Sequence, residues 1–256
     1  MSSKVPAADA TLRVLAHLSA QRGPVPAARL AAELQLPRST VYDLLSVLTE
    51  HGFVLHLREE RLYGLGPAAF ALSSAYSRQA PLARVGRPVM ERLVDEIGES
   101  GHLAVLHGRD VLYIVEERAR NRPSLVTDVG VRIPAHLTAS GRSLLAGLPP
   151  AHVNVLYSSV EDFTHRTSAA APRSPRELKD LLKQVRRDGV AHECGEVTEG
   201  FASVAALARD HAGMPAAAVA LTWVDTRAGE EEAARFARAV RRAADDLTRA
   251  LHGRKP

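Results

Sequence analysis

Hydrophobic positions within residues 34–54 recur with the period of an α-helix. The apolar side chains follow one another at i, i+3, i+4 and i+7, which predicts a helix with a single apolar stripe. The stripe consists of Val41, Leu44, Leu45 and Leu48. Pro37 suits the first turn of such a helix, and Gly52 stands just past its end, where a left-handed cap is favoured. The pattern therefore predicts an amphipathic helix from Pro37 to about Glu50.

The face opposite the apolar stripe is polar. It is centred on Ser39, Asp43, Ser46 and Glu50, with Thr40 and Tyr42 on its flanks and Arg38 at the start of the helix. A polar face of this kind suits a helix that lies in the major groove of DNA. An ordinary solvated surface has the same appearance, so the neighbouring elements have to decide between the two interpretations.

The segments on either side of this helix favour a winged helix-turn-helix. Two shorter helical patterns, at 11–20 and at about 26–34, precede it, and short apolar runs at 53–57 and 62–65 follow it as a strand pair. The polar tip of this hairpin carries Arg58 and Arg61, which could reach phosphate groups or the minor groove, although solvated turn charges are as common.

A change of pattern after Gly66 and Pro67 indicates a domain boundary. We expect a winged helix-turn-helix domain at 1–66, an alanine-rich linker helix at 67–81 and a second domain at 82–256. In the second domain, helical periods are expected at 82–97, 138–147, 149–157, 174–188 and 230–251. Strand patterns are expected at 101–107, 110–116, 124–126, 131–133, 190–194, 202–209 and 215–224. Strands in pairs flanked by helices predict an α+β domain with an antiparallel sheet.

Composition changes this interpretation in one respect. The chain has 256 residues, 46% of them hydrophobic, and a net charge of +4, but residues 1–66 carry seven basic and six acidic side chains. A nearly neutral DNA-reading domain cannot rely on bulk attraction, so phosphate contacts must come from a few placed arginines and helix N-termini.

The N-terminus lacks the apolar core of a signal peptide and the longest apolar run, 214–224, is too short to span a bilayer. We therefore expect a cytoplasmic protein without membrane contact.

Motifs that would indicate an enzyme are missing from the sequence. There is no G-x-S-x-G nucleophile turn, no G-x-G-x-x-G or P-loop pattern and no H-E-x-x-H. The nearest metal candidate combines His192, Glu193 and Cys194 with His211, and two ligands on one strand face do not make a site. The single cysteine excludes an intramolecular disulfide. We expect no catalytic residues, no metal and no cofactor.

Three separate motifs, in this order and spacing, resemble the IclR family of bacterial transcription regulators. The first is L-P-R-S-T-V-Y with L-L-S-V-L-T-E-H-G-F-V, followed by L-Y-G-L-G-P at 62–67. The second is V-R-I-P-A-H-L-T-A-S-G-R-S-L-L-A at 131–146. The third runs from G-V-A-H-E-C-G-E at 189–196 to A-R-D-H-A-G at 208–213. The resemblance implies a winged helix-turn-helix domain, a linker helix and a GAF-like effector-binding domain.

The resemblance also implies site residues for DNA. The family's DNA-reading positions fall on Arg38, Ser39, Thr40, Tyr42 and Asp43, and we add Ser46, Arg58 and Arg61 from the polar face and the hairpin tip. Asp43 departs from the family pattern, in which a basic or neutral residue is usual. A carboxylate in the groove would repel phosphate but could accept from a cytosine amino group. We therefore expect Asp43 to influence which operator is chosen.

The family's effector pocket falls on nine positions of the second domain: Thr138, Ala139, Ser140, Gly141, Glu193, Phe201, Ser203, Ala220 and Thr222. Thr138 is a good N-cap, and free N–H groups at a helix start suit a carboxylate. A helix cap that binds no ligand would have the same residues, so this alternative stays open. Ala220 stands where a polar residue would bind an acid, and Phe201 adds bulk. The expected effector is a carboxylate or an aromatic metabolite.

The function implied is that of a regulator whose binding to a pseudo-palindromic double-stranded DNA operator is controlled by a small-molecule effector. The resemblance implies a homo-oligomer, either a dimer or a dimer of dimers. The alternative is a small-molecule sensor or interaction module that has lost specific DNA binding, and the nearly neutral N-terminal domain keeps this alternative open.

Overall fold

The structure is a computed structural model of the 256-residue chain. It describes residues 5–21, 23–72, 81–120, 122–123, 128–164 and 171–251. The chain divides into two compact units, Met1–Ala80 and Pro81–Pro256, and each is described by itself. None of the helices in these ranges is long and apolar enough to cross a membrane.

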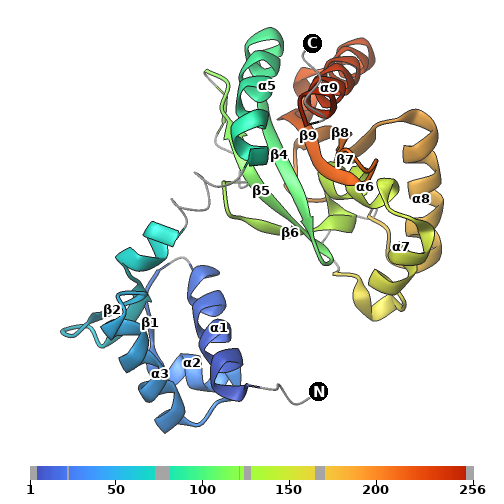
Figure 1. Cartoon of the computed structure of the whole chain (residues 1–256). Helices are drawn as coiled ribbons and strands as arrows, with labels where there is room; N and C mark the ends of the chain where they lie inside the picture. The colour runs from blue at the N-terminus through green and yellow to red at the C-terminus, as the bar shows by residue number, and fades with distance from the viewer. Residues whose placement is uncertain are drawn as a thin grey trace. The chain divides into compact units, whose positions relative to one another are not determined.

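The first unit is a three-helix domain with a small sheet (Figure 1). Its helices are α1 (Pro6–Ser19), α2 (Ala27–Leu34) and α3 (Arg38–Glu50), and its strands are β1 (Val25–Pro26), β2 (Val54–Leu57) and β3 (Leu62–Leu65). The strands form an antiparallel sheet in the order β1-β3-β2. The apolar stripes of the three helices meet in one core that includes Val14, Leu30 and Val41. This arrangement is the predicted winged helix-turn-helix.

Three details of the first unit differ from the expectation. Helix α1 begins at Pro6, not Thr11, because a proline in the first turn gives up no intrahelical hydrogen bond. Pro37 lies outside α3 as its N-cap residue, with ψ near 141°. Strand β1 was not predicted, since Pro26 argues against a strand, yet an edge strand of two residues tolerates it, and Val25 is buried opposite Tyr63.

The second unit is an α+β domain around one antiparallel sheet of six strands, in the order β6-β5-β4-β9-β8-β7. The strands are β4 (Ser100–His107), β5 (Asp110–Glu117), β6 (Arg132–Pro134), β7 (Ala191–Cys194), β8 (Phe201–Arg209) and β9 (Pro215–Val224). The helices are α5 (Pro81–Ile97), α6 (Ala139–Gly147), α7 (Pro150–Leu156), α8 (Pro175–Asp188) and α9 (Glu230–Leu251), with short 3-10 turns at Ala135–Leu137, Val160–Asp162 and Asp225–Arg227. The predicted fold class is confirmed.

Alternation along the strands divides the sheet into two apolar faces. One face, with Leu103, Val219 and Leu221, packs against α5 and α9. The other face, with Ala104 and Ala218, packs against α6, α7 and α8. Because β4 and β9 are covered on both sides, most of their residues are buried.

Two predicted elements fall wholly or partly outside the described residues. The expected strand at 124–126 lies outside them. The expected linker helix at 67–81 is helical over 67–72, and residues 73–80 lie outside.

Candidate functional site

Helix α3 is held in the first unit by its apolar stripe. Val41, Leu45 and Leu48 are buried, while Leu44, also predicted for the stripe, is half-buried at its margin. At the C-terminal end, Gly52 adopts the predicted left-handed conformation with φ of 71°. A side chain at Gly66 would come within 2.3 Å of the Gly52 carbonyl oxygen, so these two glycines allow the end of β3 to pass directly over the end of α3.

The opposite face of α3 is exposed, as the pattern predicted. Arg38, Ser39, Tyr42, Asp43 and Ser46 are exposed and Thr40 is half-buried. Val47 was missed by the sequence reasoning, although it is 53% exposed on the same face, between Ser46 and Glu50. Its spacing of four residues from Asp43 was the available signal. We call Arg38, Ser39, Thr40, Tyr42, Asp43, Ser46 and Val47 the reading face.

Arginine side chains in the described part of the first unit fall into two groups. On α1 and α2 they pair with carboxylates, as in the contacts of Arg13 with Asp9 at 3.9 Å and of Arg29 with Glu33 at 2.7 Å. In contrast, Arg38, Arg58 and Arg61 form no ion pair with any described residue, and all three are exposed. The helical scaffold thus neutralises itself, and the three arginines with unused donors lie at α3 and at the tip of the β2–β3 hairpin.

In the second unit, the start of α6 is built as a close-packed helix cap. The Thr138 hydroxyl accepts a hydrogen bond from the Gly141 N–H at 2.8 Å, as predicted for an N-cap residue. A side chain at Gly141 would lie 2.2 Å from the Ala135 carbonyl oxygen, so only glycine fits. Ala139 and Ser140 are buried beside it and carry first-turn N–H groups that have no acceptor inside the helix.

Arg142, one turn along α6, fixes this helix to the sheet. Its buried guanidinium donates to the carbonyl oxygens of His136 at 2.9 Å and His192 at 2.6 Å and forms an ion pair with Glu196 at 2.8 Å. The Glu196 side chain is buried as well and accepts from the Cys194 N–H. These contacts join the start of α6 to β7 and to the turn after it.

Strand register brings the predicted sheet residues next to one another. Glu193 on β7 pairs with Ser203 on β8, and Ser203 pairs with Thr222 on β9. The Ser203 and Thr222 hydroxyl oxygens are 3.0 Å apart. Ala220, two residues before Thr222, packs with Ala139 and Ala205 in a small apolar cluster. Phe201 lies two residues before Ser203, at the start of β8, and is half-buried.

Two further residues lie beside the predicted effector residues and were missed by the sequence reasoning. Tyr113 on β5 is buried with its hydroxyl against the Thr138 and Ser140 side chains, and the His102 ring packs edge-on against it with a centroid distance of 5.2 Å. Burial is the main reason that the pKa of Tyr113 is raised, with the Glu193 carboxyl adding to it. Pairing of Ala104 with Tyr113 across β4 and β5 could not be read from either strand alone. We call the nine predicted residues, together with Tyr113 and His102, the effector pocket.

Glu193 is the titratable acid of this pocket. It is buried, and this burial raises the pKa of its carboxyl group, while hydrogen bonds from the Val197 N–H and the Ser203 hydroxyl oppose the rise. A carboxyl group with a raised pKa stays protonated to a higher pH than an exposed one, and in that form it can donate a hydrogen bond to a bound acid as well as accept one.

Comparison with known proteins places both sites in one family. The family model of the IclR helix-turn-helix domain matches residues 7–57, and the model described as bacterial transcriptional regulator IclR C-terminal matches residues 74–249. The chain belongs to the IclR family. It is a DNA-binding transcription regulator that combines the helix-turn-helix domain of that family with its C-terminal domain.

Individual relatives agree with the family match. The transcriptional repressor IclR of Escherichia coli is 27% identical over 246 residues, which cover 94% of this chain and 88% of that protein. The glycerol operon regulatory protein of Streptomyces coelicolor is 32% identical over 215 residues, covering 84% of this chain and 82% of that protein. The solved IclR homolog from Microbacterium hydrocarbonoxydans, complexed with 4-hydroxybenzoate, shares the fold with a TM-score of 0.79 at 23% identity, and the match covers 96% of this chain and 98% of that chain.

The residues considered above as metal ligands, His192, Glu193, Cys194 and His211, do not form a metal site in the structure. His192 and Cys194 point to the exposed side of β7, whereas Glu193 between them points into the core. Within the described ranges, no group of three or more His, Cys, Asp or Glu side chains is placed to hold a metal ion.

Proposed function

We propose that the reading face of α3 inserts into the major groove of a pseudo-palindromic DNA operator, and that a small molecule in the effector pocket controls this binding. The observation that carries the proposal is the reading face, which is exposed and offers polar groups that the scaffold leaves unused. A homodimer or a dimer of dimers would place two copies of α3 on successive half-sites, about 34–36 Å apart on one side of the duplex.

Five residues of the reading face each suit one part of a DNA contact. Arg38 stands at the N-terminus of α3, where its charge and the helix dipole favour a phosphate group. Tyr42, Ser46 and Asp43 offer hydroxyl and carboxylate groups for base edges, and Val47 offers an apolar surface for a thymine methyl group. Arg58 and Arg61 at the hairpin tip are placed to contact phosphate or the minor groove on the flank.

The chemistry of the effector pocket fits a small aromatic or aliphatic acid. The first-turn N–H groups of α6 and the hydroxyls of Tyr113 and Ser203 are donors for a carboxylate. Ala139, Ala205 and Ala220 form a small buried apolar cluster beside these donors, which suits a ring or an aliphatic chain. The 4-hydroxybenzoate in the Microbacterium homolog belongs to this chemical class.

A mobility-shift assay with the DNA upstream of the chain's own coding sequence tests the function. We expect a shift with that fragment and a much weaker one with a shuffled fragment, with affinity falling steeply as salt rises. The absence of a shift at low salt, or a shift without sequence preference, would favour the alternative of a sensor module that has lost specific DNA binding. That alternative is supported by the nearly neutral charge of residues 1–66.

Ser203→Leu tests the effector pocket separately from the reading face. Leucine would project from β8 into the space between Glu193 and Thr222. We expect this variant to bind operator DNA with unchanged affinity and to lose its response to the acids that release the unmodified protein. An unchanged response would show that the pocket is assigned to the wrong residues.

A further inference from the structure

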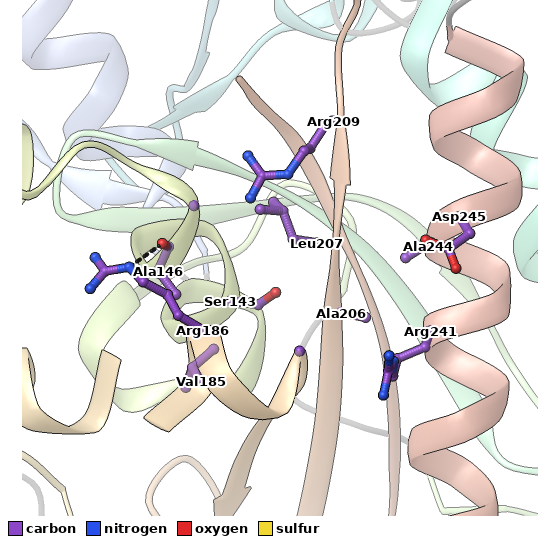
Figure 2. A pocket seen from close by; sticks show the side chains of 12 residues that line it. Ser143, Ala146, Val185, Arg186, Ala206, Leu207, Arg209, Arg241, Ala244 and Asp245 are labelled. Carbon is purple, nitrogen blue, oxygen red and sulfur yellow. Dashed lines mark hydrogen bonds between the residues drawn. The ribbon is translucent and has the colours of Figure 1, made fainter. Parts of the chain in front are cut away.

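A hollow in the C-terminal unit lies at the opposite end of α6 from the residues of the effector pocket. It has a volume of about 390 Å³ and is formed by the ends of α6 and α8, by β8 and by one side of α9 (Figure 2). We call it the arginine cleft; the part used below consists of Arg186, Arg209, Arg241, Asp245 and the β8 segment from Ala206 to Arg209. It shares no lining residue with the effector pocket.

The cleft exists because β7 stops short of the end of β8. Pairing between these two strands reaches only to Ala191 opposite Ala205. From Ala206 to Arg209, β8 is paired with β9 alone. The chain enters β7 from α8 through Gly189, so the wall that a full strand would form is replaced by the ends of two helices.

Three arginines from three different elements stand around this hollow (Figure 2). Arg186 of α8 donates through Nε to the Ala146 carbonyl oxygen at 2.8 Å, and Arg209 of β8 donates to the Gly213 carbonyl oxygen at 2.7 Å. A guanidinium has five N–H donors, so each of these two is oriented by one hydrogen bond and keeps donors in reserve. Arg241 of α9 lies beside Gly189, which has no side chain to displace it.

The charge of the cleft is not balanced by its own residues. Arg186, Arg209 and Arg241 form no ion pair with any residue that the structure describes, and Asp245 is the one carboxylate among the residues that line the cleft. The neighbouring groove between α5 and α9 differs, because Arg242 pairs there with Glu96 at 2.6 Å and Arg249 pairs with Asp246. Like charges gathered around a hollow raise the local concentration of anions.

We propose that the arginine cleft is a second ligand site, which binds a small metabolite with two anionic groups, either carboxylates or phosphate oxygens. Guanidinium groups bind such oxyanions with paired N–H donors, and two arginines on facing walls can each take one end. The volume is within the range of small-molecule sites, about 300–1,000 Å³. The ligand would contact the last turn of α6, a helix whose first turn forms part of the effector pocket, so the two ligands would act on opposite ends of one helix.

Calorimetric titration of the full chain with succinate, with hydrogen phosphate and with neutral succinamide tests this site. At low ionic strength we expect one of the two dianions to bind and succinamide not to bind. The dianion with the higher affinity shows whether the cleft prefers carboxylate or phosphate groups. Arg209→Gln and Arg241→Gln should each weaken the association roughly tenfold, the loss of one charge-assisted contact. Arg238→Gln is the matched control, since Arg238 is exposed on the same helix outside the cleft, and it should bind like the unmodified chain.

Three results would overturn the proposal. The first is that neither dianion binds at millimolar concentration. The second is that both cleft variants, with melting temperatures like that of the unmodified chain, bind as tightly as Arg238→Gln. The third is that Ser203→Leu abolishes the binding of the dianion, which would place the ligand in the effector pocket. If sedimentation shows instead that the cleft variants change the mass of the assembly while no dianion binds, the arginines serve a contact between subunits and the proposal is wrong.

Discussion

Helices α3 and α6 share several residue types and lie in opposite environments. Both begin after a residue in extended conformation, both are short, and both mix apolar residues with serine and arginine. In α3 the polar side chains are exposed, whereas eight of the nine residues of α6 are buried, including Ser140, Arg142 and Ser143. The polar groups of α3 face solvent, where the proposed DNA contact would form, and those of α6 face the protein itself and the proposed ligand.

The difference shows that hydrogen-bond satisfaction, more than composition, separates the two roles. Arg142 of α6 makes three hydrogen bonds to other parts of the domain, while Arg38 of α3 makes none within the described part of the chain. A buried polar group must be satisfied where it lies, whereas an exposed one is free to be satisfied by another molecule. Substitutions in α6 should therefore affect stability, and substitutions in α3 should affect DNA binding.

The largest effect is expected for Arg142→Leu. Loss of the guanidinium leaves the Glu196 carboxylate buried without its partner, which typically costs about 3–5 kcal/mol. Urea denaturation should show this loss in the transition of the C-terminal unit. Arg187→Leu is the control, because the Arg187–Asp188 pair is exposed, and it should change the free energy of unfolding by less than about 1 kcal/mol. Equal effects of the two variants would contradict the buried role of Arg142.

A smaller loss of stability is expected for Gly141→Ala. The added Cβ would meet the Ala135 carbonyl oxygen at 2.2 Å and must push apart the start of α6 and the turn before it. Overpacking of this kind costs about 1–3 kcal/mol. Gly229→Ala provides a control, since a Cβ there has nothing within 4 Å. Indistinguishable urea midpoints for the two variants would mean that the start of α6 is less tightly packed than described.

The effect of Arg38→Gln should appear in DNA binding and not in stability. If Arg38 contacts a phosphate group, its loss weakens binding about equally for all sequences and lowers the slope of log affinity against log salt by about 1. Fluorescence anisotropy at several salt concentrations measures both quantities. Arg29→Gln removes an exposed arginine that is paired with Glu33 on the scaffold and should leave the slope unchanged; a change of the same size in both variants would speak against a specific contact.

Much of this architecture follows from the sequence because local patterns determine it. The apolar stripe of α3, the left-handed Gly52 after it and the Thr138 cap could all be predicted, since each depends on residues a few positions apart. Strand β1 could not, because its two residues are stabilised by pairing with β3, far along the chain.

The missed site residues have the same explanation. Tyr113 and His102 join the effector pocket through the register of β4, β5 and β9, and no spacing in the sequence expresses register between distant strands. Arg142 was missed as well, because its burial depends on strand β7, which lies about 50 residues further along the chain. Val47, by contrast, was accessible to the periodicity argument and was passed over because it is apolar.

Selection of operator sequences by the unmodified chain and by Asp43→Ala tests the central claim, that α3 reads bases through its outward face. If Asp43 accepts a hydrogen bond from a cytosine amino group, the two proteins select sites that differ at one base pair in each half-site, and the variant loses its preference there by about 1–3 kcal/mol. If both proteins select the same sites and the variant binds each of them more tightly by the same factor, Asp43 only repels phosphate, and base reading at this position of α3 is contradicted.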